Sequence, residues 1–240
     1  MNDSKFKKLA KNAVSDIAKK YHVPVATIIL EPIMNNKFIK VNCTQKECPH
    51  FAICAQIPTE IVSFNNELKP IKFLFVGQGG GAEEDEQHRP FIGLAGQRLR
   101  IIIDTLQTKF IKKRFNFALS NTVRYHPNSN AVPSSRDLKY CFKYLIRDVK
   151  FLNPEYLVAL GKNVNDTMSY FNIGATLHNF HGTLWESVPS LGCRPMLLTY
   201  HPSPRNAGMK ITNTIARDIY NTYMGNNAIT ISEHLVKKYR

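Results

Sequence analysis

The sequence predicts an α/β fold built around a largely parallel β-sheet. Short apolar runs of strand length alternate along the chain with segments of helical periodicity, which is the order expected when helices connect parallel strands. Residues 73–76 are apolar throughout, as in a strand covered on both faces. Polar residues follow the predicted strands at their carboxyl ends, the edge at which such sheets bind ligands. One composite site is therefore expected at that edge.

The first half of the chain begins with a predicted amphipathic helix. Its apolar residues recur at helical spacing over residues 5–21, and lysines occupy the outer face. Residues 36–62 read as irregular and hold three of the five cysteines. A strand is expected at 71–76, a helix at 94–106 and the next strand at 115–123.

The second half continues the alternation. The sequence Ser134-Ser135-Arg136-Asp137 offers an N-cap for a helix that runs to residue 149. Residues 156–160 read as the next strand, and Gly161 ends it before a helix that runs to residue 170. The remaining expected elements are strands at 183–186 and 195–200, a helix at 210–223 and a last helix from residue 232.

The length and composition fit one good hydrophobic core, since the chain has 240 residues and 43% of them are hydrophobic. We expect a basic helix and lead-in at residues 1–35, the main domain at 36–225 and a basic helix or tail at 226–240. No apolar run approaches the roughly 20 residues that span a bilayer. The basic N-terminus also lacks the apolar core of a signal peptide. The expectation is a cytoplasmic monomer that makes no membrane contact.

The formal net charge of +14 suggests a polyanionic partner, and nucleic acid is the first candidate. The alternative is a solvated basic surface, because many lysines fall on the outer faces of predicted helices. Charge alone therefore supports nucleic-acid binding only modestly.

The most specific stretch of the sequence is residues 77–97, which connects a buried strand to a helix. Its glycine-rich start, residues 77–81, lets backbone N–H groups approach a ligand and points a helix N-terminus at negative charge. Acids, an arginine and the aromatic Phe91 follow, which are the parts needed to hold a flat polar ring. An ordinary strand-to-helix loop is the alternative reading of the glycines by themselves.

The predicted strand ends resemble the uracil-DNA glycosylase superfamily, most closely its family 4, the iron–sulfur type. The similarity runs from about residue 43 to residue 220. The motifs that carry it are Gly77-Gln78-Gly79-Gly80-Gly81-Ala82-Glu83-Glu84-Asp85, Arg89-Pro90-Phe91-Ile92-Gly93-Leu94-Ala95-Gly96-Gln97, Asn121-Thr122-Val123-Arg124-Tyr125-His126-Pro127, Leu160-Gly161 and His201-Pro202-Ser203-Pro204. The resemblance implies a three-layer α/β/α sandwich with a central, mainly parallel four-stranded sheet.

The resemblance also implies a site for a uracil flipped out of DNA. It places the ring of Phe91 against the base and the amide of Asn121 at the uracil edge, where it discriminates uracil from cytosine. His201 is implied as the donor that stabilises the departing uracil anion, with help from backbone N–H groups at Gly79 and Gly81. The expected DNA contacts are Pro202, Ser203, Pro204 and Arg205. Each residue taken singly has a structural reading, but their occurrence at four successive strand ends favours a site.

The first motif departs from the superfamily pattern. Gln78 and Gly79 stand where relatives often carry an Asp, Asn or Glu that positions the attacking water, and Gly80 replaces a proline. Gln78 stays a candidate catalytic residue although its amide is no base. Glu83, Glu84 and Asp85 are the candidate substitutes, and Asp85 is the expected polar partner for the water, by position only. Three consecutive glycines predict a mobile, poorly preorganised loop.

The cysteines form the second departure. Family 4 holds a four-iron cluster on four cysteines, and Tyr125 replaces one of them here. The resemblance and the extra cysteine at position 54 predict the ligand set Cys43, Cys48, Cys54 and Cys141. A structural zinc ion is the second possibility, and free buried thiols are the third. Cys193 lies outside this set and is expected in the core.

The sequence thus favours a hydrolase that excises uracil from DNA during base excision repair. The alternative is a catalytically weak or inactive relative that uses the same fold to bind DNA or a replication or repair protein. A glycosylase with another base preference is a narrower option. Retention of Phe91, Asn121 and His201 favours the enzyme, whereas the changes at residues 78–80 favour the inactive relative.

Overall fold

A computed structural model describes residues 35–64, 70–128, 131–169, 177–188, 191–203, 209–227 and 229–231. The helices predicted at residues 5–21 and from residue 232 lie outside these ranges. Within them, no helix has the length and apolar character needed to cross a membrane.

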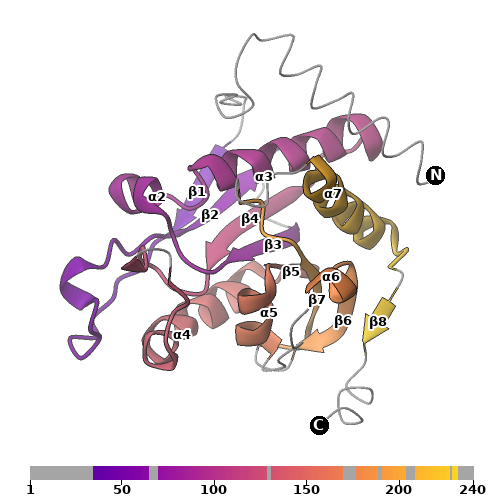
Figure 1. Cartoon of the computed structure of the whole chain (residues 1–240). Coiled ribbons are helices and arrows are strands. Elements are labelled where there is room, and N and C mark those ends of the chain that lie inside the picture. Colours follow the sequence, from indigo (N-terminus) through magenta and orange to yellow (C-terminus); the bar gives the residue numbers. More distant parts are fainter. Residues whose placement is uncertain are drawn as a thin grey trace.

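The sheet has eight strands in the order β1-β2-β4-β3-β5-β7-β6-β8 (Figure 1). Its centre consists of four mutually parallel strands, namely β4 (Asn116–Asn121), β3 (Ile71–Gly77), β5 (Tyr156–Leu160) and β7 (Arg194–Thr199). The α/β class predicted from sequence is confirmed. The sheet is wider than the expected four strands because further strands extend both edges.

One edge of the sheet was not predicted. The stretch over residues 36–62, expected to be irregular, contains β1 (Asn35–Ile39), a 3-10 helix η2 (Phe51–Ile53) and most of β2 (Thr59–Ser63), which pairs antiparallel with both β1 and β4. Strand β2 is difficult to recognise in the sequence because Glu60 interrupts its apolar pattern. Glu60 is nevertheless fully buried, because Arg89 and Arg100 bind its two oxygens.

The opposite edge is formed by β6 (Thr183–Val188) and β8 (Ile229–Ile231). β6 runs antiparallel to β7, and β8 pairs parallel with β6. The strand β8 lies where a basic helix or tail was expected from the sequence.

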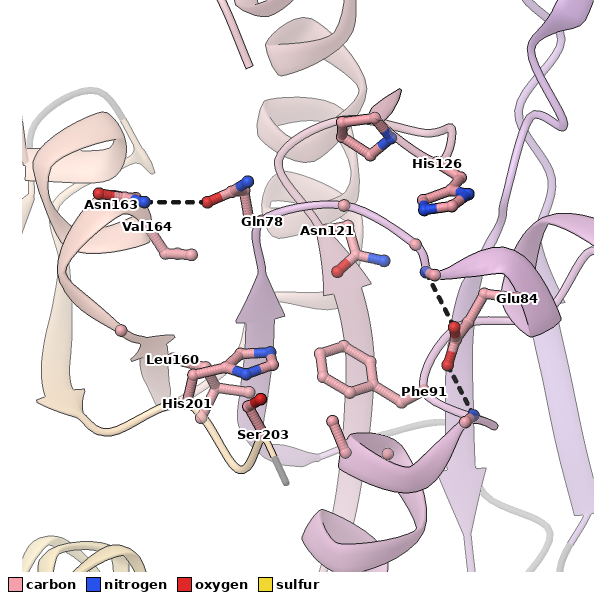
Figure 2. A pocket seen from close by; sticks show the side chains of 18 of the residues that line it. Gln78, Glu84, Phe91, Asn121, His126, Leu160, Asn163, Val164, His201 and Ser203 are labelled. Atoms are coloured by element: carbon pink, nitrogen blue, oxygen red, sulfur yellow. Dashed lines mark hydrogen bonds between the residues drawn. The ribbon is translucent and has the colours of Figure 1, made fainter. Parts of the chain in front are cut away.

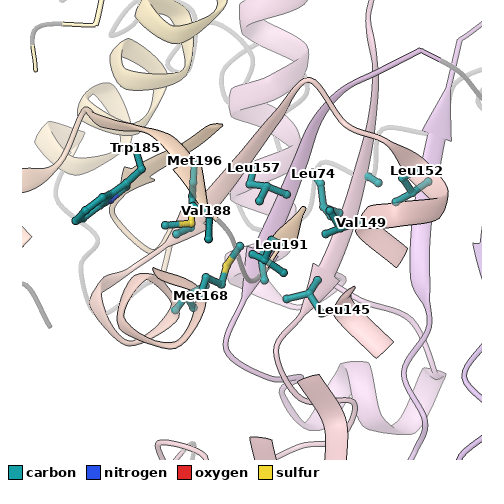
Figure 3. Close-up of a cluster of buried hydrophobic side chains, with 14 of the residues drawn as sticks. Leu74, Leu145, Val149, Leu152, Leu157, Met168, Trp185, Val188, Leu191 and Met196 are labelled. Atoms are coloured by element: carbon teal, nitrogen blue, oxygen red, sulfur yellow. The ribbon is translucent and has the colours of Figure 1, made fainter. Parts of the chain in front are cut away.

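Helices cover both faces of the sheet. On one face α3 (Leu94–Thr105), its π-helical extension η3 (Leu106–Phe110) and α7 (Met209–Met224) pack against Phe73 and Phe75. On the other, α4 (Ser135–Leu152) and α5 (Lys162–Ser169) pack against Leu74 and Val76 (Figures 1 and 3). Alternate residues of β3 thus face different helix layers, as strand geometry requires. The result is a three-layer α/β/α arrangement.

The described residues also include two short helices, α2 (Ala82–Gln87) and α6 (Leu177–Phe180). The predicted start of α4 is confirmed: Ser134 is its N-cap and accepts a hydrogen bond from the backbone N–H of Asp137 at 3.2 Å. The helix ends at Asn153, whose left-handed backbone closes the last turn.

A buried ionic network joins the sheet to α4. The guanidinium of Arg124 donates to Asp148 Oδ2 at 2.8 Å and to the Thr59 hydroxyl at 2.9 Å. Thr59 itself donates to Asp148 at 2.7 Å, and Arg147 approaches the other carboxylate oxygen from the surface. Burial lowers the pKa of Arg124, and the nearby charge of Asp148 opposes that shift. This network fixes the chain just after β4.

Replacing Asp148 with Asn should therefore destabilise the fold strongly. The change leaves the buried guanidinium of Arg124 without its counter-charge, and breaking a buried pair in this way costs about 3–5 kcal/mol. Urea unfolding measures the loss. The matched control is Asp104→Asn, which breaks the more exposed pair with Arg114 and should cost no more than about 1 kcal/mol. Equal losses in the two variants would contradict the assigned role of the network.

Candidate active site

A cavity of about 630 Å³ opens at the carboxyl ends of the four central strands. Its lining comes from the loops that follow β3 and β7, the end of β4 and the turn after β5. Seven residues predicted from the sequence line it: Gln78, Gly79, Gly81, Phe91, Asn121, His201 and Ser203. In Figure 2 the side chains of Phe91, Asn121 and His201 surround a common space. Parallel pairing of the strands thus brings together residues that are far apart in the sequence.

Phe91 and Asn121 meet beside the end of β3. Gly77 pairs with Asn121 in the parallel register, and a Cβ atom at Gly77 would lie 2.5 Å from Asn121 Oδ1 and 2.8 Å from Phe91 Cζ. Only a glycine leaves room for the ring and the amide together. The glycine at the end of the strand therefore sets the spacing between the two predicted base-binding side chains.

The backbone of Phe91 adopts the left-handed region, with φ of 55°. A bulky residue there carries strain of about 1–3 kcal/mol, so the surroundings must hold it. Gly96 of α3 packs directly on it, since a Cβ atom there would lie 2.0 Å from the Phe91 carbonyl. The Arg100 guanidinium donates to the same carbonyl at 3.1 Å and is itself bound to buried Glu60. Strand β2 thereby helps to fix the aromatic ring.

Glu84 organises the loops on both sides of the short helix α2. Its buried carboxylate accepts backbone N–H bonds from Gly81 at 2.9 Å, Ile92 at 2.8 Å and Gly93 at 2.7 Å. Sequence reasoning missed this role because it considered the acids of the motif only as partners for water. The available signal was an acid at the third position of a helix that follows a glycine turn, the position of a capping-box acid.

Hydrogen bonds and close packing hold the glycine loop, and the expectation of a mobile loop did not take these contacts into account. The N–H of Gly80 donates to the Tyr125 carbonyl at 3.2 Å, and the carbonyls of Gly77 and Gln78 accept from the chain after β4. A Cβ atom at Gly80 would lie 2.3 Å from Ile57 Cδ1, and one at Gly79 would lie 2.8 Å from Pro127 Cδ. These glycines permit close packing rather than movement.

Gln78 and Asp85 act as connections between loops. The Gln78 amide donates to the Ala131 carbonyl at 2.7 Å and accepts from the Asn163 amide at 3.1 Å (Figure 2). Asp85 accepts from the backbone N–H of His126 at 3.1 Å and is not among the residues that line the cavity. Neighbouring Glu83 has an exposed side chain and does line it.

His201 follows β7 and begins a loop that α3 contacts. Burial lowers its pKa below the usual value of 6.5, and the charge of Glu84 partly opposes that shift. A neutral imidazole at neutral pH follows, with one N–H to donate. Arg98 of α3 donates to the carbonyls of Pro202 and Ser203, at 3.4 Å and 3.1 Å, which fixes the loop.

Not all of the predicted DNA contacts can be placed. Pro202 is buried and lies outside the cavity lining, whereas Ser203 is half-buried and lines it. Pro204 and Arg205 lie outside the described residues. His126 and Asn163, which the sequence places at strand ends without a role, also line the cavity, from the loop after β4 and the first turn of α5.

The cysteines predicted as ligands lie on two neighbouring segments. Cys43, Cys48 and Cys141 are buried and Cys54 is half-buried. Burial, followed by the charges of Cys54 and Cys48, raises the pKa of the Cys141 thiol to about 11, so these sulfurs are near neighbours. Among the residues that the structure describes, no three His, Cys, Asp or Glu side chains are arranged to hold a metal ion.

Cys193 is exposed, so its predicted place in the core is wrong. The turn that carries it explains the error. Its N–H donates to the Val188 carbonyl at 3.1 Å and its φ is 56°, so the tight connection from β6 to β7 directs its side chain to the surface.

Comparisons with known proteins agree with the motifs. The family model of the uracil-DNA glycosylase superfamily matches residues 67–222. A type-4 uracil-DNA glycosylase of Thermotoga maritima is 28% identical over 150 residues, which cover 62% of this chain and 74% of that protein. A type-4 enzyme of Pyrobaculum aerophilum is 35% identical over 88 residues, which cover 37% of this chain and 43% of that protein.

A solved structure of a Zn-dependent exopeptidase from Parabacteroides distasonis aligns with a TM-score of 0.41 at 9% identity, over 92% of this chain and 97% of that one. A likeness at that level carries no conclusion about fold or function.

Glu84→Gln tests the organising role of this carboxylate. An amide in its place turns one acceptor into a donor that faces a backbone N–H, so we expect a loss of about 1–3 kcal/mol in the free energy of unfolding. Glu86→Gln, on the exposed side of the same helix, is the control and should change stability by less than about 0.5 kcal/mol. Chemical denaturation of both proteins is the measurement. A Glu84 variant as stable as the control would show that the three N–H bonds are dispensable.

Proposed function

Because the chain belongs to the uracil-DNA glycosylase superfamily, we propose that it removes uracil from DNA by hydrolysing the bond between base and deoxyribose. The observation that carries the proposal is the convergence of Phe91, Asn121 and His201 on one cavity at the ends of the parallel strands. The type-4 relatives support the same reaction. The product is an abasic site, and the step belongs to base excision repair.

Recognition of the base falls to Phe91 and Asn121. The ring of Phe91 offers a flat apolar surface on which a flipped pyrimidine stacks. The Asn121 amide carries a donor and an acceptor, which match a carbonyl and the ring N–H of uracil. Cytosine presents an unprotonated ring nitrogen and an amino group at that edge, so the amide has to rotate by about 180° to pair with it. Discrimination therefore requires that the orientation of the Asn121 amide be held in the uracil-binding sense. The space left by Gly77 keeps the amide and the ring adjacent.

Leaving-group stabilisation falls to His201. Cleavage of the glycosidic bond places negative charge on the uracil oxygens and positive charge on the sugar. A neutral imidazole donates its N–H to that oxygen without adding a fixed positive charge beside the sugar cation. The backbone N–H of Gly79 is the candidate in the loop to support the anion. The N–H of Gly81, also expected there from the sequence, is already donated to the Glu84 carboxylate.

Water activation falls to an acid of the first motif. Asp85, the candidate from the sequence, is bound to the His126 backbone, and both ends of the Gln78 amide are engaged. Glu83 is the acid of the motif whose exposed side chain lines the cavity and is not engaged by the backbone bonds that hold Glu84. We therefore assign the water to Glu83 in preference to Asp85. Ser203, Pro204 and Arg205 remain the proposed DNA contacts of the loop after β7.

A four-iron cluster on Cys43, Cys48, Cys54 and Cys141 is the proposed cofactor. The support is the chemistry of the donors, because four thiols are the ligands of a cubane cluster and Cys54 packs beside Cys141. In the part of the chain that the structure describes, the four side chains are not arranged around a metal position. The bound cluster would supply a rigid cross-link between residues 43–54 and α4. Structural zinc is the alternative for the same ligands.

The absence of an acid at positions 78 and 79 favours a second candidate, a relative that binds DNA without cutting it. The two functions differ in one assay, excision from an oligonucleotide with a single uracil.

His201→Ala should lower the excision rate by roughly 10²–10³-fold, the usual cost of losing one anion-stabilising donor. The control is His88→Asn, at an exposed histidine outside the cavity, which should stay close to the parent rate. In the same assay Glu83→Gln should be slower than Asp85→Ala. If neither the parent protein nor any variant excised uracil while DNA binding was intact, the function would instead be that of a relative that binds DNA without cutting it.

The pH dependence gives a second test of His201. Because burial lowers its pKa, the imidazole stays neutral as the pH falls through 6.5, and excision should decline only below that point. The unfolded chain takes up the proton at higher pH than the folded one, so His201 also makes folding stability fall as the pH drops below 6.5. A histidine NMR titration with its midpoint at or above 6.5 would contradict the buried neutral imidazole.

Loss of a cluster ligand should be visible without any activity measurement. Protein purified anaerobically should contain iron and absorb broadly at about 400 nm, as thiolate-bound iron–sulfur clusters do. Cys141→Ser should lose both signals, whereas Cys193→Ser should keep them because that thiol is exposed and outside the set. Colourless protein that contains zinc would contradict the cluster and support a structural zinc ion at the same ligands.

A further inference from the structure

The outer face of α4 carries a continuous stripe of basic side chains. Its members are all exposed and follow one another at intervals of three or four residues: Arg136, Lys139, Lys143, Arg147 and Lys150. At 3.6 residues per turn these positions fall within roughly 80° of one another around the helix axis, and they extend over about 21 Å. We call this surface the α4 stripe.

Acidic side chains of the same helix do not neutralise the stripe. Asp137 is buried and bound by Ser134 and His50, and Asp148 is buried in the network with Arg124. Of the five cations, Arg147 is paired with a carboxylate, that of Asp148. Like charges three or four residues apart on a helix repel one another, so this spacing weakens the helix. Stability of α4 therefore gives no reason for the pattern.

The stripe is continuous with the edge of the cavity. The side chain of Gln78, a lining residue, donates to the carbonyl of Ala131, four residues before the start of α4 at Ser135. From there the helix runs along the face of the sheet opposite α3 and α7 (Figure 1). Its buried face, with Leu145 and Val149, points at the sheet, so the stripe points outward. A polyanion that reaches the cavity can continue along this helix.

We propose that the α4 stripe binds the sugar–phosphate backbone of DNA that flanks the nucleotide in the cavity. The charge and length match that occupant, because about 21 Å corresponds to about six phosphates along one strand. The surface lies outside the loops that grip the flipped base, so it adds affinity and extends the footprint without sequence preference. That the bound polyanion is the DNA strand carrying the flipped nucleotide rests on the proposed function. Binding of DNA to the α4 stripe does not itself depend on excision.

The test compares two variants with the same change in charge. The first replaces Lys139, Lys143 and Lys150 with Gln and leaves Arg147 in place, since Arg147 contacts Asp148. The control replaces Lys109, Lys112 and Lys113, which are exposed at the end of η3 and in the turn after it. Binding of undamaged duplex DNA of about 30 base pairs is measured over a range of salt concentrations by fluorescence anisotropy.

The stripe variant should bind roughly tenfold or more weakly at low salt, and its slope of log affinity against log salt should fall by about 1 per lysine. The control should keep the parent slope. An oligonucleotide only long enough to fill the cavity should bind both variants alike, and its uracil should be excised at the parent rate at saturation. Thermal unfolding should match in both, because Gln and Lys have similar helix propensity.

Equal losses in the two variants would overturn the proposal, because they would report general attraction between a basic protein and DNA. A stripe variant with the DNA affinity and salt slope of the parent would also overturn the proposal. If an acidic peptide then bound to the stripe, the partner of this surface would be a protein instead. If the protein did not excise uracil but its salt slope still depended on the stripe, the proposed function would be wrong and the proposed DNA-binding surface would be supported.

Discussion

Parallel pairing of β4, β3, β5 and β7 is the constraint on which the rest of this structure depends. Parallel strands end at the same edge of a sheet, so four strand ends and the loops that follow them lie at that edge. The register pairs Gly77 of β3 with Asn121 of β4 and Leu160 of β5 with Thr199 of β7, which brings the amide proposed to bind the base and the turn before His201 to one edge of the sheet. No local segment contains this site, and any slip of one strand relative to its neighbour would disperse it.

Buried carboxylates turn this edge into a fixed site. Glu84 collects three backbone N–H groups, and Glu60 holds the two arginines that reach the Phe91 segment. The strained backbone of Phe91 persists because these contacts, and the close packing of Gly96, leave it no alternative position. Glu84 and Glu60 thus serve the architecture, and the chemistry proposed for the cavity rests on His201, the Asn121 amide and the exposed acid Glu83.

The sequence predicted the features that depend on periodicity and on motif order, and it missed those that depend on partners. Alternating strands and helices, the cap at Ser134 and the joint placement of Phe91, Asn121 and His201 followed from local patterns. Strand β2 did not, because a charged Glu60 is compatible with burial only when two distant arginines bind it. The three glycines were read as flexible, but their packing against Ile57 and Pro127 arises from loops that the sequence does not place.

The same use of acids inside the fold shapes the outer surface. Among the residues that the structure describes, five carboxylates are buried (Glu60, Glu84, Asp137, Asp148 and Asp218), against one fully buried guanidinium, that of Arg124. The carboxylates that organise loops and pair with arginines are therefore withdrawn from the surface, where the lysines remain. A chain with a formal charge of +14 consequently presents solvent with faces, such as that of α4, on which positive charge is contiguous. Preorganisation of the cavity and attraction for a polyanion follow from one distribution of charge, because each acid buried to fix the site also leaves the exterior more basic.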